Sequence, residues 1–480
     1  MIYPLRIALT GLFCFICMKS HSQEIVAKEG SFGLDENKKI IVWHQTNIDS
    51  LLLTKGKINS FKFGKKFVVV DTAKSLSYTM PLTLSFRDDL YLLYVTKLPL
   101  IHLSTQKAIN DNSKSLGVFT YFNEGRYVEN VMGIEHRGNL SLSFPKKSYD
   151  LEFWMDSTSK KKKNVKFKGL RSDDDWILDG LYNEPLRIRS TLAAKLWLEI
   201  HKPNYLQSEP KAKSGFDVTY VEVFKNNDYI GLYSLSEGVD RKLLALKKND
   251  KQTISGELFK AFSYEGAPAF KKAPTYNNLF PHWGGFEMKF PLVESKAHWE
   301  DISQLVNLVV HGSDDEFASK IGGHVNVVNA IDYFLFVNLL RATDNLGKNY
   351  YLAKYDEGNP YFFVPWDLDG VVGIIKEGKR ISTTDDILSN GLFDRLLKVD
   401  PNDYRNRLKQ RWGKLRKDHL AEQKLLLSLE KVYSRMKTEK IYEREHLIWL
   451  SEFTTQENYE YLKSWLKNRL VYLDEYFDGL

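Results

Sequence analysis

Short apolar runs dominate the chain before Leu98, and charged or turn-forming residues separate them. The runs are IIVW from Ile40, FVVVDT from Phe67, LTLSF from Leu82 and LYLLYV from Leu90. Runs of this length, rich in β-branched and aromatic residues, are typical of strands. Arg87, Asp88 and Asp89 separate the last two runs as a hairpin turn would. The pattern predicts a small all-β module over residues 23–97.

The next part of the chain also favours strands, interrupted by one helix. SYDLEFW from Ser148 and VKFKGL from Val165 have strand-like composition, and YVEVF and YIGLYSL between Tyr220 and Ser236 predict a hairpin. In between, Leu192, Leu196 and Ile200 recur at helical spacing. We therefore expect a strand-rich region that extends to about residue 300.

After about Leu305 the pattern changes to helices. Ile331, Phe334, Leu335 and Leu339 lie on one face of a helix predicted over 329–340, which leads directly into RATDNLGKN. Further helices are expected after Pro401, and a last one from Thr454. Strands, one helix, more strands and then a helical part is the order of elements in a two-lobed protein kinase.

The N-terminus predicts export. Arg6 precedes an apolar run from Ile7 to Met18, and small residues follow at Ser20 and Ser22. This is the pattern of a signal peptide over residues 1–22, because the run is too short for a spanning helix of ~20 residues. Both cysteines, Cys14 and Cys17, lie in the apolar run. We expect a secreted, periplasmic or cell-surface protein without disulfides and without a stable membrane span after cleavage.

Composition and charge narrow the function only slightly. A hydrophobic content of 43% and an aromatic content of 13% indicate well-packed globular structure. The formal net charge of +7 is mild for 480 residues, so it does not indicate nucleic acid as a partner. The sequence contains no HExxH, no GxSxG and no Walker loop, which argues against the corresponding hydrolases and nucleotide-binding folds.

The candidate chemistry lies between residues 341 and 373. Phosphoryl transfer from ATP uses an aspartate that receives the hydroxyl proton and an asparagine that holds metal, spaced DxxxxN, and a further metal-binding aspartate. Asp344 and Asn349 have this spacing, and Asp367 follows the strand-like run YFFVPW. Asp369 is close enough to compete with Asp367 for the second metal-binding role.

Several longer segments resemble the CotH kinase family. They are EHRGNLSLSFPKKSYDLEF from Glu135, NNDYIGLYSLSEGVD from Asn226, GELFKAF from Gly256, DNLGKNYYL from Asp344 and VPWDLDG from Val364. They occur in family order from about Leu98 to the C-terminal helix. The resemblance implies an α+β fold, namely an atypical protein-kinase-like two-lobed domain over 98–480 that follows the small N-terminal all-β module, with the catalytic loop at 341–373.

The same resemblance assigns roles to individual residues. It implies that Asp344 is catalytic, that Asn349 and Asp367 (or Asp369) hold Mg²⁺ or Mn²⁺, and that ATP is the phosphate donor.

The resemblance also implies a phosphate-binding element at Lys146 and Lys147. If both lie in a strand they face opposite sides, so only one should reach the nucleotide, and the pattern does not decide which. Glu237 ends a predicted strand and is expected either at the adenine edge or as the partner of a lysine.

One departure from ordinary kinases leaves alternatives open. No GxGxxG is present, and Arg137 with Gly138 is the expected substitute. The leading hypothesis is a metal-dependent kinase that phosphorylates hydroxyl side chains of exported or cell-surface proteins. The alternatives are a non-catalytic scaffold on a kinase-like fold and an enzyme that transfers another group of ATP, such as AMP.

Overall fold

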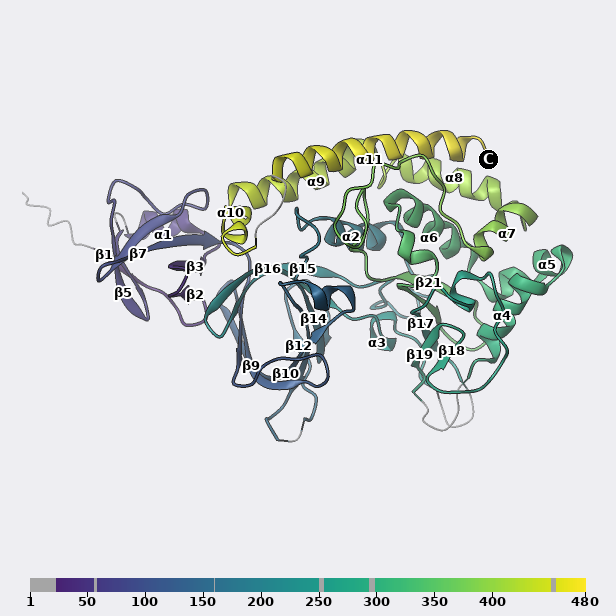
Figure 1. The fold of residues 1–480 in the computed structure, drawn as a ribbon, viewed down its shortest axis with the longest axis horizontal. Coiled ribbons are helices and arrows are strands. Elements are labelled where there is room, and N and C mark those ends of the chain that lie inside the picture. The colour runs from purple at the N-terminus through teal and green to yellow at the C-terminus, as the bar shows by residue number, and fades with distance from the viewer. Residues whose placement is uncertain (1–22, 56–57, 159, 250–253, 293–297, 450–454) are drawn as a thin grey trace, which may run out of the picture.

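The computed structural model contains both helices and sheets, and β-structure forms the N-terminal part (Figure 1). It describes residues 23–55, 58–158, 160–249, 254–292, 298–449 and 455–480. The predicted signal peptide lies outside the described residues. No helix in the described ranges is both long and apolar enough to cross a membrane.

A seven-stranded sheet forms the N-terminal part, on the left of Figure 1. Its strands, in sheet order, are β1 (Gln23–Val26), β4 (Ile58–Phe63), β5 (Lys65–Val69), β6 (Leu82–Phe86), β7 (Asp89–Thr96), β3 (Ile40–His44) and β2 (Phe32–Asp35). Phe86 pairs with Asp89, which confirms the predicted hairpin. The expected all-β module also contains one short helix, α1 (Ile48–Lys55), over the polar-flanked segment IDSLLLTK, for which the sequence analysis predicted no element.

The next strands close into a barrel. In order around it they are β10 (Arg126–Arg137), β11 (Ser148–Trp154), β14 (Asp175–Asp179), β16 (Asp228–Glu237), β15 (Val218–Lys225), β8 (Leu100–Thr105) and β9 (Ser115–Asn123). Alternate residues point inward and fill the interior with a core that includes Phe119, Phe153, Phe167 and Trp176. Of the predicted strand VKFKGL only Val165–Lys166 (β12) is a strand, paired with β13 (Ser172–Asp173).

A five-stranded sheet carries the candidate chemistry. Its order is β18 (His282–Trp283), β19 (Phe286–Phe290), β17 (Glu257–Ala261), β20 (Tyr350–Lys354) and β21 (Phe362–Pro365). Helices predominate after residue 300 as expected, but two strands of this sheet, β20 and β21, lie beyond that position. β17, which precedes that position in sequence, pairs directly with β20, which follows it.

Helices surround this sheet and extend along one side of the whole molecule. They are α2 (Arg189–Ile200), α3 (Arg241–Leu244), α4 (Glu300–His311), α5 (Asp314–His324), α6 (Val327–Leu340), α7 (Gly391–Val399), α8 (Tyr404–Arg416), α9 (Glu422–Thr438), α10 (Ile441–His446) and α11 (Thr455–Asp478). In Figure 1 α9 and α11 run side by side along the top edge, and α10 lies next to the barrel. All side chains of α6 from Asn329 to Leu340 are buried, so this helix forms the centre of the largest apolar core.

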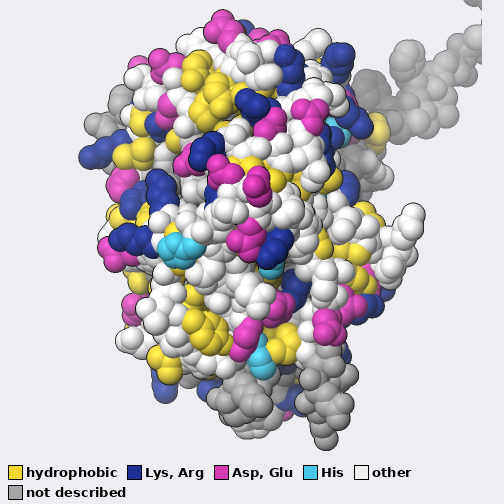
Figure 2. Space-filling model, turned by 90° about the vertical axis from the view of Figure 1, so that its right-hand side faces the viewer, with side chains coloured by type: hydrophobic (Ala, Val, Ile, Leu, Met, Phe, Trp, Pro, Cys, Tyr) yellow, Lys and Arg dark blue, Asp and Glu magenta, His cyan; other side chains and the backbone are white. Residues whose placement is uncertain are grey.

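The outer face of the helical part has no dominant charge. Figure 2 shows acidic and basic side chains interspersed over the described residues of that face, without a broad region of one sign. Several of these charges form exposed pairs, such as Lys398 with Asp314. Such pairs contribute little to stability, because water already solvates both partners.

A buried charge on α10, Arg444, connects this helix to the rest of the chain. Arg444 is fully buried and pairs with Glu222 of the barrel, which is also fully buried. Thr96 and Tyr229 donate hydrogen bonds to the same carboxylate. The Arg444 guanidinium also donates to the carbonyl oxygen of Glu439 at 2.7 Å. The N-terminal sheet, the barrel and the C-terminal helices therefore meet at one buried ion pair.

We predict that Arg444→Ala lowers the free energy of unfolding by about 3–5 kcal/mol, because it leaves the Glu222 carboxylate buried without a countercharge. Urea denaturation followed by tryptophan fluorescence measures this. The matched control is Lys398→Ala, which removes an exposed pair and should change stability by less than about 1 kcal/mol. Equal effects of the two substitutions would contradict this account of the α10 junction.

Candidate active site

The end of α6 and the loop after it position Asp344. Arg341 closes α6 in a left-handed conformation (φ 51°), and its guanidinium is anchored by Asp386 at 2.7 Å. The chain then makes a 3-10 turn over Thr343–Leu346, and Asp344 lies in this turn. The hydroxyl of Tyr333 on α6 donates to the carbonyl oxygen of Asn345 at 2.6 Å. A hydrogen bond from helix α6 thus holds in place the turn that carries Asp344.

Asn345 connects this turn to the following hairpin. Its buried amide donates to the carbonyl oxygen of Asn349 at 2.5 Å and to that of Trp366 at 2.8 Å. Both carbonyls lie just outside the same end of the β20–β21 ladder, where Tyr350 pairs with Pro365. One side chain therefore holds together the catalytic turn and both strands. The sequence analysis did not assign Asn345 a role, although it lies within the DxxxxN spacing.

The hairpin brings Asn349 and Asp367 together. The backbone N–H of Trp366 donates to the carbonyl oxygen of Asn349 at 3.0 Å, so Asp367 follows directly on the strand opposite Asn349. Both residues have a left-handed backbone, with φ of 58° and 54°. Asn and Asp tolerate this conformation better than most residues, and such backbone is enriched at functional sites.

Four carboxylates surround the resulting recess. Asp179, Asp367 and Asp369 line it, and Asp344 is near enough to raise the pKa of both Asp367 and Asp369. Burial, followed by the charges of Asp367 and Asp179, holds the pKa of Asp369 well above its ordinary value. Burial also raises the pKa of Asp367, although this side chain is still open to solvent within the recess. Carboxylates that raise one another's pKa favour a bound cation, because a positive charge offsets their repulsion.

Asp179 lines the recess and Asn183 contacts Asp369, but the sequence pattern pointed to neither residue. Asp179 ends β14 and accepts hydrogen bonds from Ser148 and from the backbone N–H of Leu181, both at 3.1 Å. The amide of Asn183 donates to Asp369 at 2.9 Å. Neither residue lies near the DxxxxN spacing, so only the barrel fold places them beside the hairpin.

Two cations reach the carboxylates. Arg137 ends β10 and lines the recess, with its guanidinium 5.8 Å from the centre of the Trp366 ring. Its charge lowers the pKa of Asp367, and so does that of Lys260 on β17. Burial is the main cause of the lowered pKa of Lys260 itself. Lys260 lies within the segment GELFKAF, and the strand partner of that segment, β20, could be recognised only in the fold.

The structure places Lys146 and Lys147 elsewhere. They precede β11 and are not within a strand as expected, because the chain turns until Ser148 starts the pairing. Lys146 is fully buried, pairs with Glu445 of α10 and donates to the carbonyl oxygen of Leu232 at 2.6 Å. Burial lowers its pKa to about 8. Lys147 donates to the carbonyl oxygen of Leu142 at 2.5 Å. Neither lysine is among the residues that line the recess.

Glu237 is the partner of a lysine, which was one of its two expected roles. It ends β16, is fully buried and pairs with Lys213 at 2.7 Å. The backbone N–H groups of Arg171 and Asp217 donate to the same carboxylate at 2.7 Å and 3.0 Å. These contacts bind the Glu237 carboxylate to neighbouring parts of the chain. Glu237 does not line the acidic recess.

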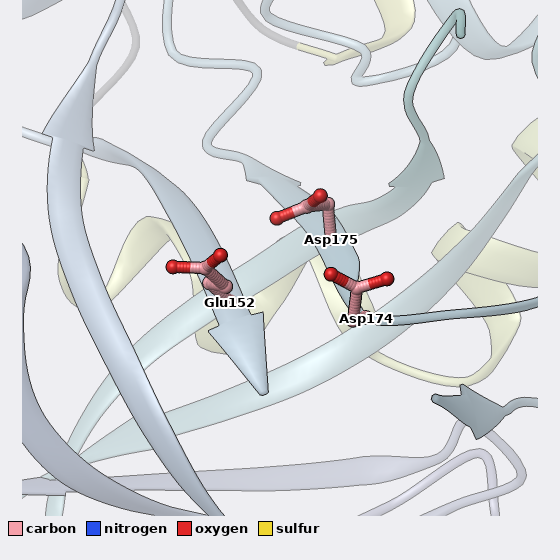
Figure 3. A group of neighbouring side chains, drawn as sticks. All are labelled: Glu152, Asp174 and Asp175. Atoms are coloured by element: carbon pink, nitrogen blue, oxygen red, sulfur yellow. The ribbon is translucent and has the colours of Figure 1, made fainter. Parts of the chain in front are cut away.

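A second acidic group lies on the barrel (Figure 3). Glu152, Asp174 and Asp175 have carboxylate oxygens within 4.8 Å of one another. The ammonium of Lys162 lies 2.8 Å from Glu152, 3.1 Å from Asp174 and 3.6 Å from Asp175. Lys242 adds a second positive charge at 2.9 Å from Asp174. Lysines therefore pair directly with this group, whereas no lysine or arginine forms an ion pair with Asp367 or Asp369 among the described residues, and burial still raises the pKa of Asp175 to about 6.

Comparison with known proteins identifies the family of this chain. A family model described as CotH kinase protein matches residues 134–473, which include every residue of the recess. The chain is also 24% identical over 249 residues to the inner spore coat protein H of Bacillus subtilis (strain 168). That match covers 52% of this chain and 61% of the relative, so the chain spans about three fifths of the relative that it matches.

We predict that Asp369→Asn raises the melting temperature of the metal-free protein near neutral pH by a few degrees. As pH rises above about 4, an unfolded aspartate loses its proton while folded Asp369 retains it, so the stability of the wild type falls. The asparagine has no such proton to lose. The gain should therefore shrink as pH falls toward the ordinary pKa of aspartate, 3.8.

Thermal denaturation in chelator between about pH 4 and pH 8 measures this difference. Asp385→Asn, at an exposed aspartate, is the matched control and should show no such pH-dependent gain. A gain that is constant across the pH range, or a loss of stability at neutral pH, would contradict the proposed cause of the Asp369 shift.

Proposed function

Because this chain belongs to the CotH kinase protein family, we propose that it is an exported atypical protein kinase that transfers the γ-phosphate of ATP to hydroxyl side chains. The observation that carries the proposal is the convergence of Asp344, Asn349 and Asp367 at one end of the β20–β21 hairpin. In this reading the barrel side and the helical side of the recess correspond to the two lobes of a kinase.

The oxygen-rich recess fits a divalent cation. Carboxylate and amide oxygens are the ligands that Mg²⁺ and Mn²⁺ prefer, and Asp367, Asp369 and Asn349 offer them. When bound, the metal would neutralise the charge of the β- and γ-phosphates. Asp179 adds a further carboxylate at the wall.

Each remaining residue has a role in holding the reactants. Asp344 receives the proton of the acceptor hydroxyl, and Asn345 fixes its turn against the hairpin. Arg137 and Lys260 are the two cations beside Asp367, and they are the candidates that contact phosphate oxygens in the absence of a glycine-rich loop. Arg137 is held over Trp366, so its charge is positioned before any nucleotide binds.

Parallel incubations with α-labelled and γ-labelled ATP test the proposed reaction class. Casein serves as the acceptor, and Mg²⁺ or Mn²⁺ is included. Label from the γ position alone supports a kinase. Label from the α position shows transfer of AMP, and label from neither favours a non-catalytic scaffold.

We predict that ATP binding measured by calorimetry collapses in chelator, because without metal only Arg137 and Lys260, among the described residues, would offset the charge of the phosphates beside the acidic recess. Asp367→Asn and Asp369→Asn should each weaken metal-dependent ATP binding at least about tenfold, and the larger loss identifies the bridging ligand. The matched control is Asp175→Asn in the lysine-neutralised group, which should leave binding unchanged. Equal ATP affinity with and without metal would contradict the metal assignment.

We predict that Asp344→Asn lowers kcat by ~10²–10⁴-fold while the affinity for metal and ATP stays close to that of the wild type. The substitution keeps the shape of the side chain and leaves Asn349 and Asp367 unchanged. Steady-state kinetics with calorimetry checks the two parts separately, and the melting temperature without nucleotide shows that the variant is folded. Unchanged turnover in a folded variant would remove Asp344 from the mechanism.

A further inference from the structure

The hydroxyl of Tyr264 is bonded to the proposed proton acceptor. Tyr264 lies in the segment between β17 and Ala267, and its Oη donates to Oδ1 of Asp344 at 2.6 Å. The ring lies against Gly347, where an added Cβ would come within 2.4 Å of it. Lys348 pairs with the other oxygen of Asp344 at 3.0 Å and lies 5.4 Å from the centre of the Tyr264 ring. The phenol of Tyr264 thus packs closely against the turn that carries Asp344.

The position of the Tyr264 hydroxyl is the one that an acceptor hydroxyl must occupy. A group that gives its proton to Asp344 has to lie within about 2.6–3.2 Å of the carboxylate, and Tyr264 Oη already does. Asp344 is in turn close enough to influence Asp367 and Asp369, beside which the phosphates would bind. The phenol therefore already contacts the proton acceptor, which itself lies near the proposed nucleotide site.

Resting on the proposed kinase function, we propose that Tyr264 is a phosphorylation site of this protein, modified in cis by its own active site. Tyr264 Oη attacks the γ-phosphorus of ATP, and an O–P bond forms. The bond from the γ-phosphorus to the β,γ-bridging oxygen breaks, and ADP leaves with the electron pair. The phenol proton passes to the Asp344 carboxylate and from there to water.

The surroundings of Tyr264 suit both the reaction and its consequence. Burial and the Asp344 charge raise the pKa of the phenol, so it stays protonated at neutral pH and needs a base for attack. The side chain is still 45% exposed, so it can leave its place. A phosphate on Tyr264 adds about −1.5 to −2 charges next to Asp344, and this repulsion opens the acceptor position to an external hydroxyl.

The test is mass spectrometry of the full-length protein after incubation with ATP and Mg²⁺, with casein present as an external acceptor. We expect near-stoichiometric phosphate on the peptide that contains Tyr264, at a rate independent of protein concentration. Tyr264→Phe should lack this phosphate, and Asp344→Asn should form it at least ~10²-fold more slowly. The matched control is Tyr276→Phe, which removes another exposed tyrosine–carboxylate contact, to Glu300, and should leave the phosphate on Tyr264.

A mixed incubation separates transfer in cis from transfer between molecules. Wild-type protein is combined with a mass-labelled Asp344→Asn chain, whose folding is checked by its melting temperature, and only the wild type should be modified. Phosphate on Tyr264 of the Asp344→Asn chain would overturn the cis assignment. Phosphate on casein but never on Tyr264 would overturn the inference and leave the kinase function standing. No γ-phosphate transfer to any acceptor would contradict both.

Discussion

The pairing of β20 with β21 is the constraint on which the candidate site depends. The ladder sets Asn349 beside Trp366, and therefore places Asp367 at the same end of the sheet. Both residues leave the strands with a left-handed backbone, which turns them out of the ladder. Asn345 then fastens the Asp344 turn to both strand ends. A single short hairpin thus gathers the residues to which we assign three different roles in the proposed phosphoryl transfer.

The two acidic groups of the described chain differ in the cations that contact them. Around Glu152, Asp174 and Asp175, lysines neutralise the carboxylates directly. Around Asp367 the carboxylates retain raised pKa values, although Arg137 and Lys260 are close. Repulsion of this kind reduces the stability of the empty site. A cation bound by the carboxylate oxygens would relieve this repulsion. In a structural charge network, protein side chains already neutralise the carboxylates, so a bound ion would bring no such gain.

Buried ion pairs in this protein serve the assembly of its parts, and α10 provides two of them. Glu445 accepts from Lys146 and Arg187, and Arg444 pairs with Glu222. This explains why Lys146, which the family resemblance suggested as a phosphate contact, lies within the structure instead. The ammonium of Lys146 is fully buried, is already bound to Glu445 and to the carbonyl oxygen of Leu232, and does not line the recess. Positive charge at the recess comes from Arg137 and Lys260, which belong to strands on opposite sides of it.

The sequence by itself determined the local elements and the one motif whose residues are neighbours along the chain. Apolar periodicity was enough to locate the β6–β7 and β15–β16 hairpins, α2 and α6, since the spacing of apolar residues along the chain already shows which type of element can bury them. Asp344, Asn349 and Asp367 were found because a turn and one hairpin separate them. Barrel closure, the contribution of Asp179, Asn183 and Lys260, and the burial of Lys146 were decided only by the tertiary structure. Those features depend on strands and helices far apart in sequence, whose pairing follows from competition for buried surface across the whole chain, and no local pattern encodes the outcome.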